Sequence, residues 1–158
     1  MIRPARSDDA PALALLHVEV WEAAYGSLMP AEVFTARRAG LAERVDRWRE
    51  ILRTSPARTL VALDPASQRL LGFSSDGPAR DDDLAGGREL WALYVDAAAW
   101  GTGVGHALIG EAIGEDPASL WVLRGNDRAL AFYARHGFAL DGVERSDEYG
   151  VELRMVRG

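Results

Sequence analysis

The sequence predicts an α+β fold around a mixed, mostly antiparallel central sheet of about six to seven strands, flanked by about four helices. Two observations predict it. The chain has 158 residues, 48% of them hydrophobic, which suits an ordinary core, so we expect residues 1–158 to form a single domain. The apolar pattern runs as a strand, two helical regions and a group of strands, and then as strand, helix, strand, helix and two strands.

The first third of the chain is predicted to be mainly helical. A short strand covers residues 2–5, and Ser7 starts a helix as its N-cap, with two acids in the first turn. Apolar residues then recur every three or four positions up to Tyr25, and the glycine that follows ends the helix. A second helical region, residues 30–53, is broken near Gly40.

The rest of the chain alternates strands and helices. The first two strands form a hairpin, and a polar loop at residues 76–87 leads into the third. The predicted elements are strands at 59–63, 69–75 and 90–95, a glycine-rich turn at 101–105, a helix at 104–113, a strand at 119–123, a helix at 126–136 and strands at 138–143 and 151–156.

Two residue types are missing from the composition. The chain has no cysteine, and all 18 basic residues are arginine. These absences exclude lysine Schiff bases, Walker-type phosphate loops, thiol nucleophiles and cysteine-ligated metal sites. No two histidines have the spacing of metal ligands, so we expect no metal.

Charge and hydropathy restrict the partners. The net charge is −6 and the arginines form no dense cluster, so we expect no nucleic-acid partner. Apolar runs are only a few residues long and the chain begins without a signal-like segment, so we expect a soluble cytoplasmic protein that does not enter a membrane.

The most informative segment is Leu90 to Leu108, where a strand leads through alternating glycines directly into a helix. Backbone N–H groups and the helix dipole converge there on one point, which makes an anion site without any lysine. A dinucleotide fingerprint does not fit, because His106 stands where its third glycine belongs. A plain strand-to-helix turn is the alternative for the glycines alone.

A second segment lies about twenty residues further on and reads Asn126-Asp127-Arg128-Ala129-Leu130-Ala131-Phe132-Tyr133-Ala134-Arg135-His136-Gly137-Phe138. In this order and with a strand between them, the two segments resemble the acetyl-CoA loop and the following helix of the GNAT superfamily of acetyl-CoA-dependent N-acetyltransferases. The element order over nearly the whole chain agrees with a GNAT-like fold. One departure is Trp100, which takes the place of the loop's usual arginine or glutamine.

The resemblance implies that acetyl-CoA is the cosubstrate. The end of the strand would pair with the pantetheine arm, the loop would hold the pyrophosphate, and Asn126 would hydrogen-bond the arm, although an asparagine at this place is also an ordinary helix N-cap. The implied contacts are Leu93, Tyr94, Val95, Trp100, Gly101, Thr102, Gly103, Val104, Gly105, His106, Asn126 and Phe132.

Two residues are the candidate catalytic groups. Tyr133 matches the general acid that protonates the leaving thiolate, and it is otherwise a core residue of an amphipathic helix. Glu89 is the candidate base that takes a proton from the amine, and its alternative is a solvated strand end. Because Glu89 lies roughly 20 Å along the strand from Val95, this role needs a bulge or a bridging water. Tyr94 and the acids of residues 81–83 are further candidates.

The acceptor is expected to be a small-molecule amine or a peptide amine. The resemblance points to Trp21 and Tyr25 as its binding wall, where cation–π contact competes with ordinary core packing as the reason for these aromatics. The acidic net charge favours a cationic acceptor. A homodimer is also compatible with the resemblance.

We therefore expect an N-acetyltransferase in which the amine attacks acetyl-CoA directly in a ternary complex. Two alternatives remain: a non-catalytic acyl-CoA-binding or sensing module, and a protein-interaction domain that uses the second helical region. Thiol release from acetyl-CoA would indicate the enzyme, and acetyl-CoA binding without turnover would indicate the sensing module. No acetyl-CoA binding at all would indicate the interaction domain.

Overall fold

Seven strands form one continuous sheet in the computed structural model, which describes residues 1–158. They are β1 (Ile2–Pro4), β2 (Arg58–Leu63), β3 (Leu70–Pro78), β4 (Arg88–Val95), β5 (Ala118–Leu123), β6 (Ala139–Asp147) and β7 (Gly150–Arg157). Their order across the sheet is β1-β2-β3-β4-β5-β7-β6, and every neighbouring pair is antiparallel except β4 and β5. The predicted mixed, mostly antiparallel sheet is confirmed.

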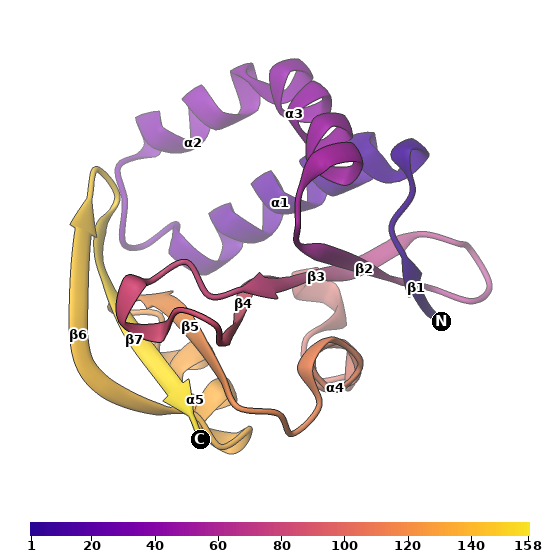
Figure 1. Ribbon diagram of the computed structural model, residues 1–158. Coiled ribbons are helices and arrows are strands. Elements are labelled where there is room, and N and C mark those ends of the chain that lie inside the picture. Colours follow the sequence, from indigo (N-terminus) through magenta and orange to yellow (C-terminus); the bar gives the residue numbers. More distant parts are fainter.

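Helices cover both faces of this sheet. They are α1 (Ala10–Tyr25), α2 (Ala31–Ala39), α3 (Leu41–Thr54), α4 (Val104–Ile113) and α5 (Asp127–Arg135). Figure 1 shows α1, α2 and α3 on one side of the sheet and α4 and α5 on the other. There are five helices because the second helical region divides at Gly40 into α2 and α3, which form an arch over α1. No helix is long and apolar enough to cross a membrane.

Three local expectations need correction. Ser7 does not cap α1 but begins a short 3-10 turn, and Asp9 accepts the Arg6 N–H at 2.7 Å instead. The loop predicted at residues 76–87 is shorter, because β3 continues to Pro78. Strand β6 runs on to Asp147, beyond the predicted end at residue 143; all its residues are exposed, so no apolar alternation marks it.

The interior consists of two cores, one on each face of the sheet. Leu108, Ile109 and Ile113 of α4 pack with Leu120 of β5 on one face, together with Phe138. The other core joins Leu13 and Leu16 of α1 to Trp48 of α3 and Phe73 of β3. Burial of apolar surface on both faces is the main stabilising contribution to such a layered fold.

The C-terminal end of α4 is held by arginines. Arg58 Nη2 donates to the carbonyls of Glu111 at 3.1 Å and Ala112 at 2.7 Å, and Arg88 Nη2 donates to Ala112 at 2.7 Å. Both guanidinium groups also pair with Asp76, whose side chain is 3% exposed. These bonds satisfy carbonyls that the helix itself leaves without partners. Asp76 therefore links β2, β3, β4 and α4.

We predict that Asp76→Asn lowers the free energy of unfolding by about 2 kcal/mol, because it leaves two cations without their shared carboxylate. The arginines are half-exposed, so the loss falls below that of a fully buried pair. Urea denaturation measures it. Asp46→Asn is the control, since Asp46 forms only an exposed i,i+3 pair with Arg49 on α3. Equal effects of the two substitutions would contradict the structural role of Asp76.

His17 of α1 lies inside the second core. Its ring is 4.7 Å from that of Tyr94 and 6.0 Å from that of Phe73, measured between centroids. Burial lowers the pKa of His17 to about 3, and the positive charges of Arg37 and Arg44 add to the shift. The imidazole is therefore neutral in the folded protein at physiological pH.

This depressed pKa predicts acid sensitivity. The unfolded chain binds a proton at His17 below its ordinary pKa near 6.5, whereas the folded chain does not bind it until about pH 3. Stability from this site is complete above pH 6.5 and is lost as the pH falls toward 3. Relative to His17→Gln, the wild type should lose about 3 kcal/mol between pH 7 and pH 4, measured by urea denaturation at each pH. A pH-independent difference would contradict the assignment.

Candidate functional site

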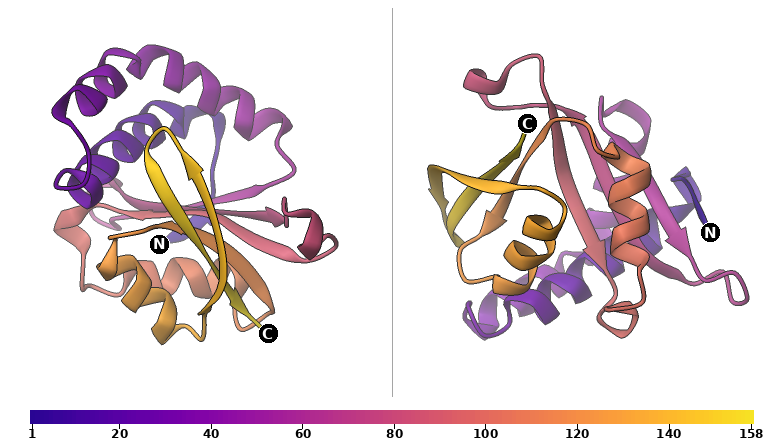
Figure 2. Two further views of the ribbon diagram at one scale, coloured as in Figure 1. Left: turned by 90° about the vertical axis from the view of Figure 1, so that its left-hand side faces the viewer. Right: turned by 90° about the horizontal axis from the view of Figure 1, so that it is seen from below.

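Strands β4 and β5 separate after only two paired positions. Glu89 pairs with Ser119 and Leu90 with Leu120, and beyond them β4 pairs only with β3. Figure 2 shows the two strands side by side at one end and apart at the other. The β5-facing backbone edge of residues 91–95 therefore has no neighbouring strand, so an extended ligand can pair with it.

A bulge in β4 lies at the point of separation. Asp76 pairs with Leu90 and Ser75 pairs with Ala92, which leaves Trp91 without a partner. One extra residue changes the face to which the following side chains point. Leu90 accordingly packs into the core beneath α4, whereas Tyr94 packs into the core beneath α1.

A cavity of about 810 Å³ occupies the space between the separated strands. Its walls come from four regions: β4, the β5 residues Trp121 and Val122, the turn from Ala99 to His106 together with α5, and the α1 residues Val20, Ala24 and Tyr25. This volume lies within the range of small-molecule sites. The cavity thus reaches from the start of α4 to α1, on the opposite face of the sheet.

The glycine turn shapes one end of this cavity. Gly101 and Gly103 have positive φ angles of 75° and 91°, which side chains rarely adopt. Gly105 lies against Phe132, and an added Cβ would come within 3.4 Å of that ring. The backbone N–H groups of Val104, Gly105 and His106 begin α4 and make no hydrogen bond within the protein. Free N–H donors at the positive end of a helix dipole are suited to an anion.

Arginine and histidine side chains surround the same end. Arg128, Arg135, His106 and His136 line the cavity there, with Glu115 as the acidic residue among them. The Arg128 guanidinium lies 3.5 Å from the centroid of the Trp100 ring. This stacking brings a cation to the residue that replaces the loop's usual arginine or glutamine. We did not predict Arg128 or Arg135, although both follow Asn126 on one helix and are seven residues apart, a spacing that returns to the same face.

Three tyrosines line the cavity: Tyr133 is buried, and Tyr25 and Tyr94 are half-buried. Burial raises the pKa of each phenol. The negative charge that a neighbouring phenolate would carry raises the pKa of Tyr94 and Tyr133 further. All three hydroxyls therefore stay protonated at neutral pH and can donate a hydrogen bond or a proton.

Asn126 is the N-cap of α5 and also reaches the cavity. Its Oδ1 accepts the N–H of Ala129 at 3.2 Å, which is a helix N-cap. The residue also lines the cavity next to Tyr25. Leu93, Val95, Trp100 and Phe132 line it as well.

Several predicted site residues lie elsewhere. Thr102 and Val104 do not line the cavity, and the Thr102 hydroxyl donates back to the Ala99 carbonyl. Trp21 is 8% exposed and stands behind Tyr25 rather than at the cavity wall. The face of its ring is covered by Arg37, whose guanidinium lies 3.9 Å from the centroid. Packing of this kind had no signal in the sequence.

Glu89 is also outside the cavity, although the bulge that its proposed role required is present. Its side chain is 1% exposed and pairs with Arg80, with 2.7 Å between Nη2 and Oε1, and it accepts the Arg80 N–H at 2.9 Å. The acids at residues 81–83 likewise face away from the cavity, because Asp81 and Asp83 pair with Arg154 of β7. The structure brings no predicted carboxylate to the cavity.

Comparison with known proteins identifies the family. The model of the acetyltransferase (GNAT) domain matches residues 55–140, more than half of the chain. The chain is 25% identical to the uncharacterized N-acetyltransferase YuaI of Bacillus subtilis, over 98% of this chain and 89% of that protein.

Solved structures share the fold. The PaiA N-acetyltransferase of Thermoplasma acidophilum, solved in complex with coenzyme A, superposes with a TM-score of 0.77 at 22% identity, over 99% of this chain and 97% of that one. A histone acetyltransferase HPA2-related protein of Corynebacterium glutamicum gives 0.72 at 21% identity, over 99% and 94%. The chain therefore belongs to the GNAT family of N-acetyltransferases, as its two motifs predicted.

Proposed function

We propose that this enzyme transfers an acetyl group from acetyl-CoA to a primary amine by direct attack of the amine on the thioester while both substrates are bound. The observation that carries the proposal is the single cavity that joins the anion-binding turn before α4 to the tyrosine-lined region beside α1. A donor and an acceptor can meet there from opposite ends. The chain has no cysteine to form an acyl-cysteine intermediate.

The donor would occupy the end of the cavity beside α4 and α5. The free N–H groups of Val104 to His106 would hold its pyrophosphate, and Arg128 and Arg135 would add positive charge. The unpaired edge of Leu93 to Val95 would hydrogen-bond the pantetheine arm like an added strand. Asn126 would contact the arm from α5 while it caps that helix. This arrangement supports a seven-strand unit, residues 1–158, as one acetyltransferase domain.

Tyr133 would act as the general acid. The amine nitrogen bonds to the acetyl carbon, the carbon–sulfur bond breaks, and the leaving thiolate takes the phenolic proton of Tyr133. Burial raises the pKa of this phenol, which by itself makes it a weaker acid. The same burial destabilises the thiolate as well, so the proton transfer between them stays balanced.

The proton of the attacking amine would leave through water. Glu89 is held by an ion pair with Arg80. Glu115 lines the cavity, but at the donor end, with Arg128 and Arg135. Glu89 and the acids of residues 81–83 lie outside the cavity, and Tyr94 stays protonated, so these observations favour a water chain as the route.

Tyr133→Phe should reduce kcat by about 10²- to 10³-fold, because it removes the proton donor and preserves the ring packing against Phe132 and Phe138. Thiol release from acetyl-CoA over a panel of polyamines, amino acids, aminoglycosides and peptide N-termini measures the activity. Acetyl-CoA affinity, measured by calorimetry, should change little.

Tyr149→Phe is the matched control, since Tyr149 lies on the β6–β7 turn and does not line the cavity. Equal kcat in wild type and Tyr133→Phe would contradict the acid role. Tight acetyl-CoA binding without thiol release from any amine would instead favour a sensing module, and an absence of acetyl-CoA binding would favour an interaction domain.

Glu89→Gln separates a structural role from a catalytic one. If Glu89 only holds Arg80 and the loop before β4, the variant should have a lower Tm and a kcat within about threefold of wild type, with an unchanged pH–rate profile. A large loss of kcat together with the disappearance of the acidic limb of that profile would restore Glu89 as the base.

A further inference from the structure

Arg37 of α2 and Arg44 of α3 differ from the other arginines of this chain. Both are half-buried, and neither forms an ion pair or donates a hydrogen bond to the protein. The Nε atoms of both are fully buried and have no partner. Most other arginines pair with a carboxylate, and Arg157 donates to three carbonyls. A guanidinium nitrogen that is buried without a hydrogen-bond partner is costly, and neither half-buried side chain has a carboxylate of the protein to offset that cost.

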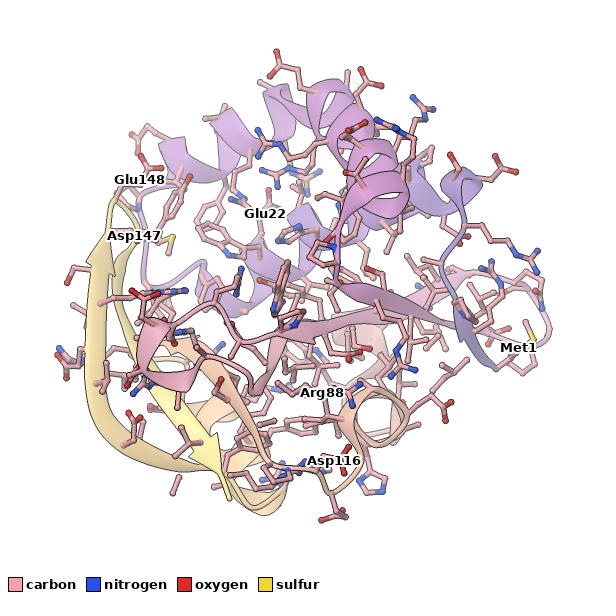
Figure 3. All side chains as sticks on the ribbon, in the orientation of Figure 1. Met1, Glu22, Arg88, Asp116, Asp147 and Glu148 are labelled. Carbon is pink, nitrogen blue, oxygen red and sulfur yellow. The ribbon has the colours of Figure 1, made fainter.

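The two side chains lie together beneath the α2–α3 arch. Both positive charges act on His17 of α1, and the charge of Arg37 lowers the pKa of Arg44, after the larger effect of burial. Figure 3 shows nitrogen-bearing side chains projecting from the arch toward α1. Two like charges therefore share one partly dehydrated space.

No carboxylate of the protein neutralises this pair. Glu22 of α1 forms a two-pronged pair with Arg38 of α2, with both distances 2.7 Å. Apart from other arginines, only Tyr149 and Tyr94 act on the pKa of Arg44, and a tyrosine carries no charge while its phenol is protonated. An incoming anion would find two guanidinium groups without competition.

The pair adjoins the acceptor end of the cavity. Arg37 covers the ring of Trp21, and the centroid of that ring is 5.1 Å from the centroid of Tyr25, which lines the cavity. Tyr94 lines the same cavity and lies near both arginines. The charge of Arg37 lowers the pKa of Tyr94, and the charge of a Tyr94 phenolate would raise the pKa of Arg44. The arginines therefore lie beside the α1 end of the cavity without being among the residues that line it, and away from the glycine turn before α4.

We propose that Arg37 and Arg44 bind a carboxylate of the acceptor, so that the substrate is an amine that also carries a carboxylate, such as an amino acid or the end of a peptide. Guanidinium groups match carboxylates in shape and bind them through paired hydrogen bonds. This inference rests on the proposed acetyltransferase function and names its substrate class. It reverses the expectation of a cationic acceptor, because the net charge of −6 does not describe the charge at this site.

Matched acceptors test the proposal in wild type, Arg37→Gln, Arg44→Gln and the control Arg47→Gln, an exposed residue of α3 without an ion pair. Thiol release is measured for amino acids with aromatic, aliphatic and polar side chains and for their C-terminal amides, which lack the charge. In wild type and Arg47→Gln, kcat/KM should be at least about tenfold higher for the acid than for the amide of the preferred pair. In Arg37→Gln and Arg44→Gln this ratio should fall to about threefold or less.

A binding measurement keeps the test independent of turnover. Calorimetry with coenzyme A-saturated protein compares N-acetyl amino acids with their amides, and the acid should bind more tightly only while both arginines are present. Arg44→Lys, which keeps the charge but loses the planar fork, should retain part of the preference. Unchanged coenzyme A affinity shows that each variant is folded.

The outcomes separate the two proposals. Equal use and equal binding of acid and amide by the wild type would overturn the carboxylate site and leave the acetyltransferase function intact. If no amine is acetylated but acid-selective binding still depends on Arg37 and Arg44, the proposed function fails and the carboxylate site stands. Acid selectivity that survives both glutamine substitutions would also overturn the assignment.

Discussion

The rest of the molecule depends on the separation of β4 from β5 after two paired positions. A parallel pair that opens in this way leaves backbone polar groups exposed inside the fold, which is tolerable only where water or a ligand can reach them. The remaining strands keep the sheet continuous on both sides of the opening, and a separate core supports each face. The surrounding sheet therefore holds the opening, and the cavity within it, in a fixed shape, which is what the proposed site requires.

Local features of the fold could be predicted from the sequence, and relations between distant elements could not. Helix α4 has its predicted bounds, because glycines of positive φ precede it and its apolar periodicity is strong. Glu89 was misplaced because its partner Arg80 lies across a loop whose path the sequence does not reveal. Trp21 has an aromatic side chain of the kind that binds amines, yet Arg37 from another helix covers its ring. The end of β6 could not be predicted, because all its residues are exposed and the strand therefore shows no alternation of apolar and polar residues.

The lack of lysine has structural consequences beyond the mechanisms that it excludes. Every cation is a planar guanidinium, which can stack on an aromatic ring and donate hydrogen bonds in its own plane at the same time. Arg128 stacks on Trp100 at the donor end, and Arg80 stacks on Trp91 while it pairs with Glu89. Arg157 donates to carbonyls at the ends of α4 and α5 and covers Phe138. A lysine ammonium could not make these combined contacts.

The two ends of the cavity come from different stretches of the chain. The turn, α4 and α5, which would hold the donor, lie between residues 100 and 137, whereas α1 and the α2–α3 arch lie before residue 55. These stretches lie on opposite faces of the opened sheet, and each contributes a tyrosine to the cavity wall, Tyr25 from α1 and Tyr133 from α5. Changes in the arch can therefore accumulate without altering the donor pocket. In evolutionary terms, such a division would let the choice of acceptor diverge among descendants of one gene while the acyl donor stays the same.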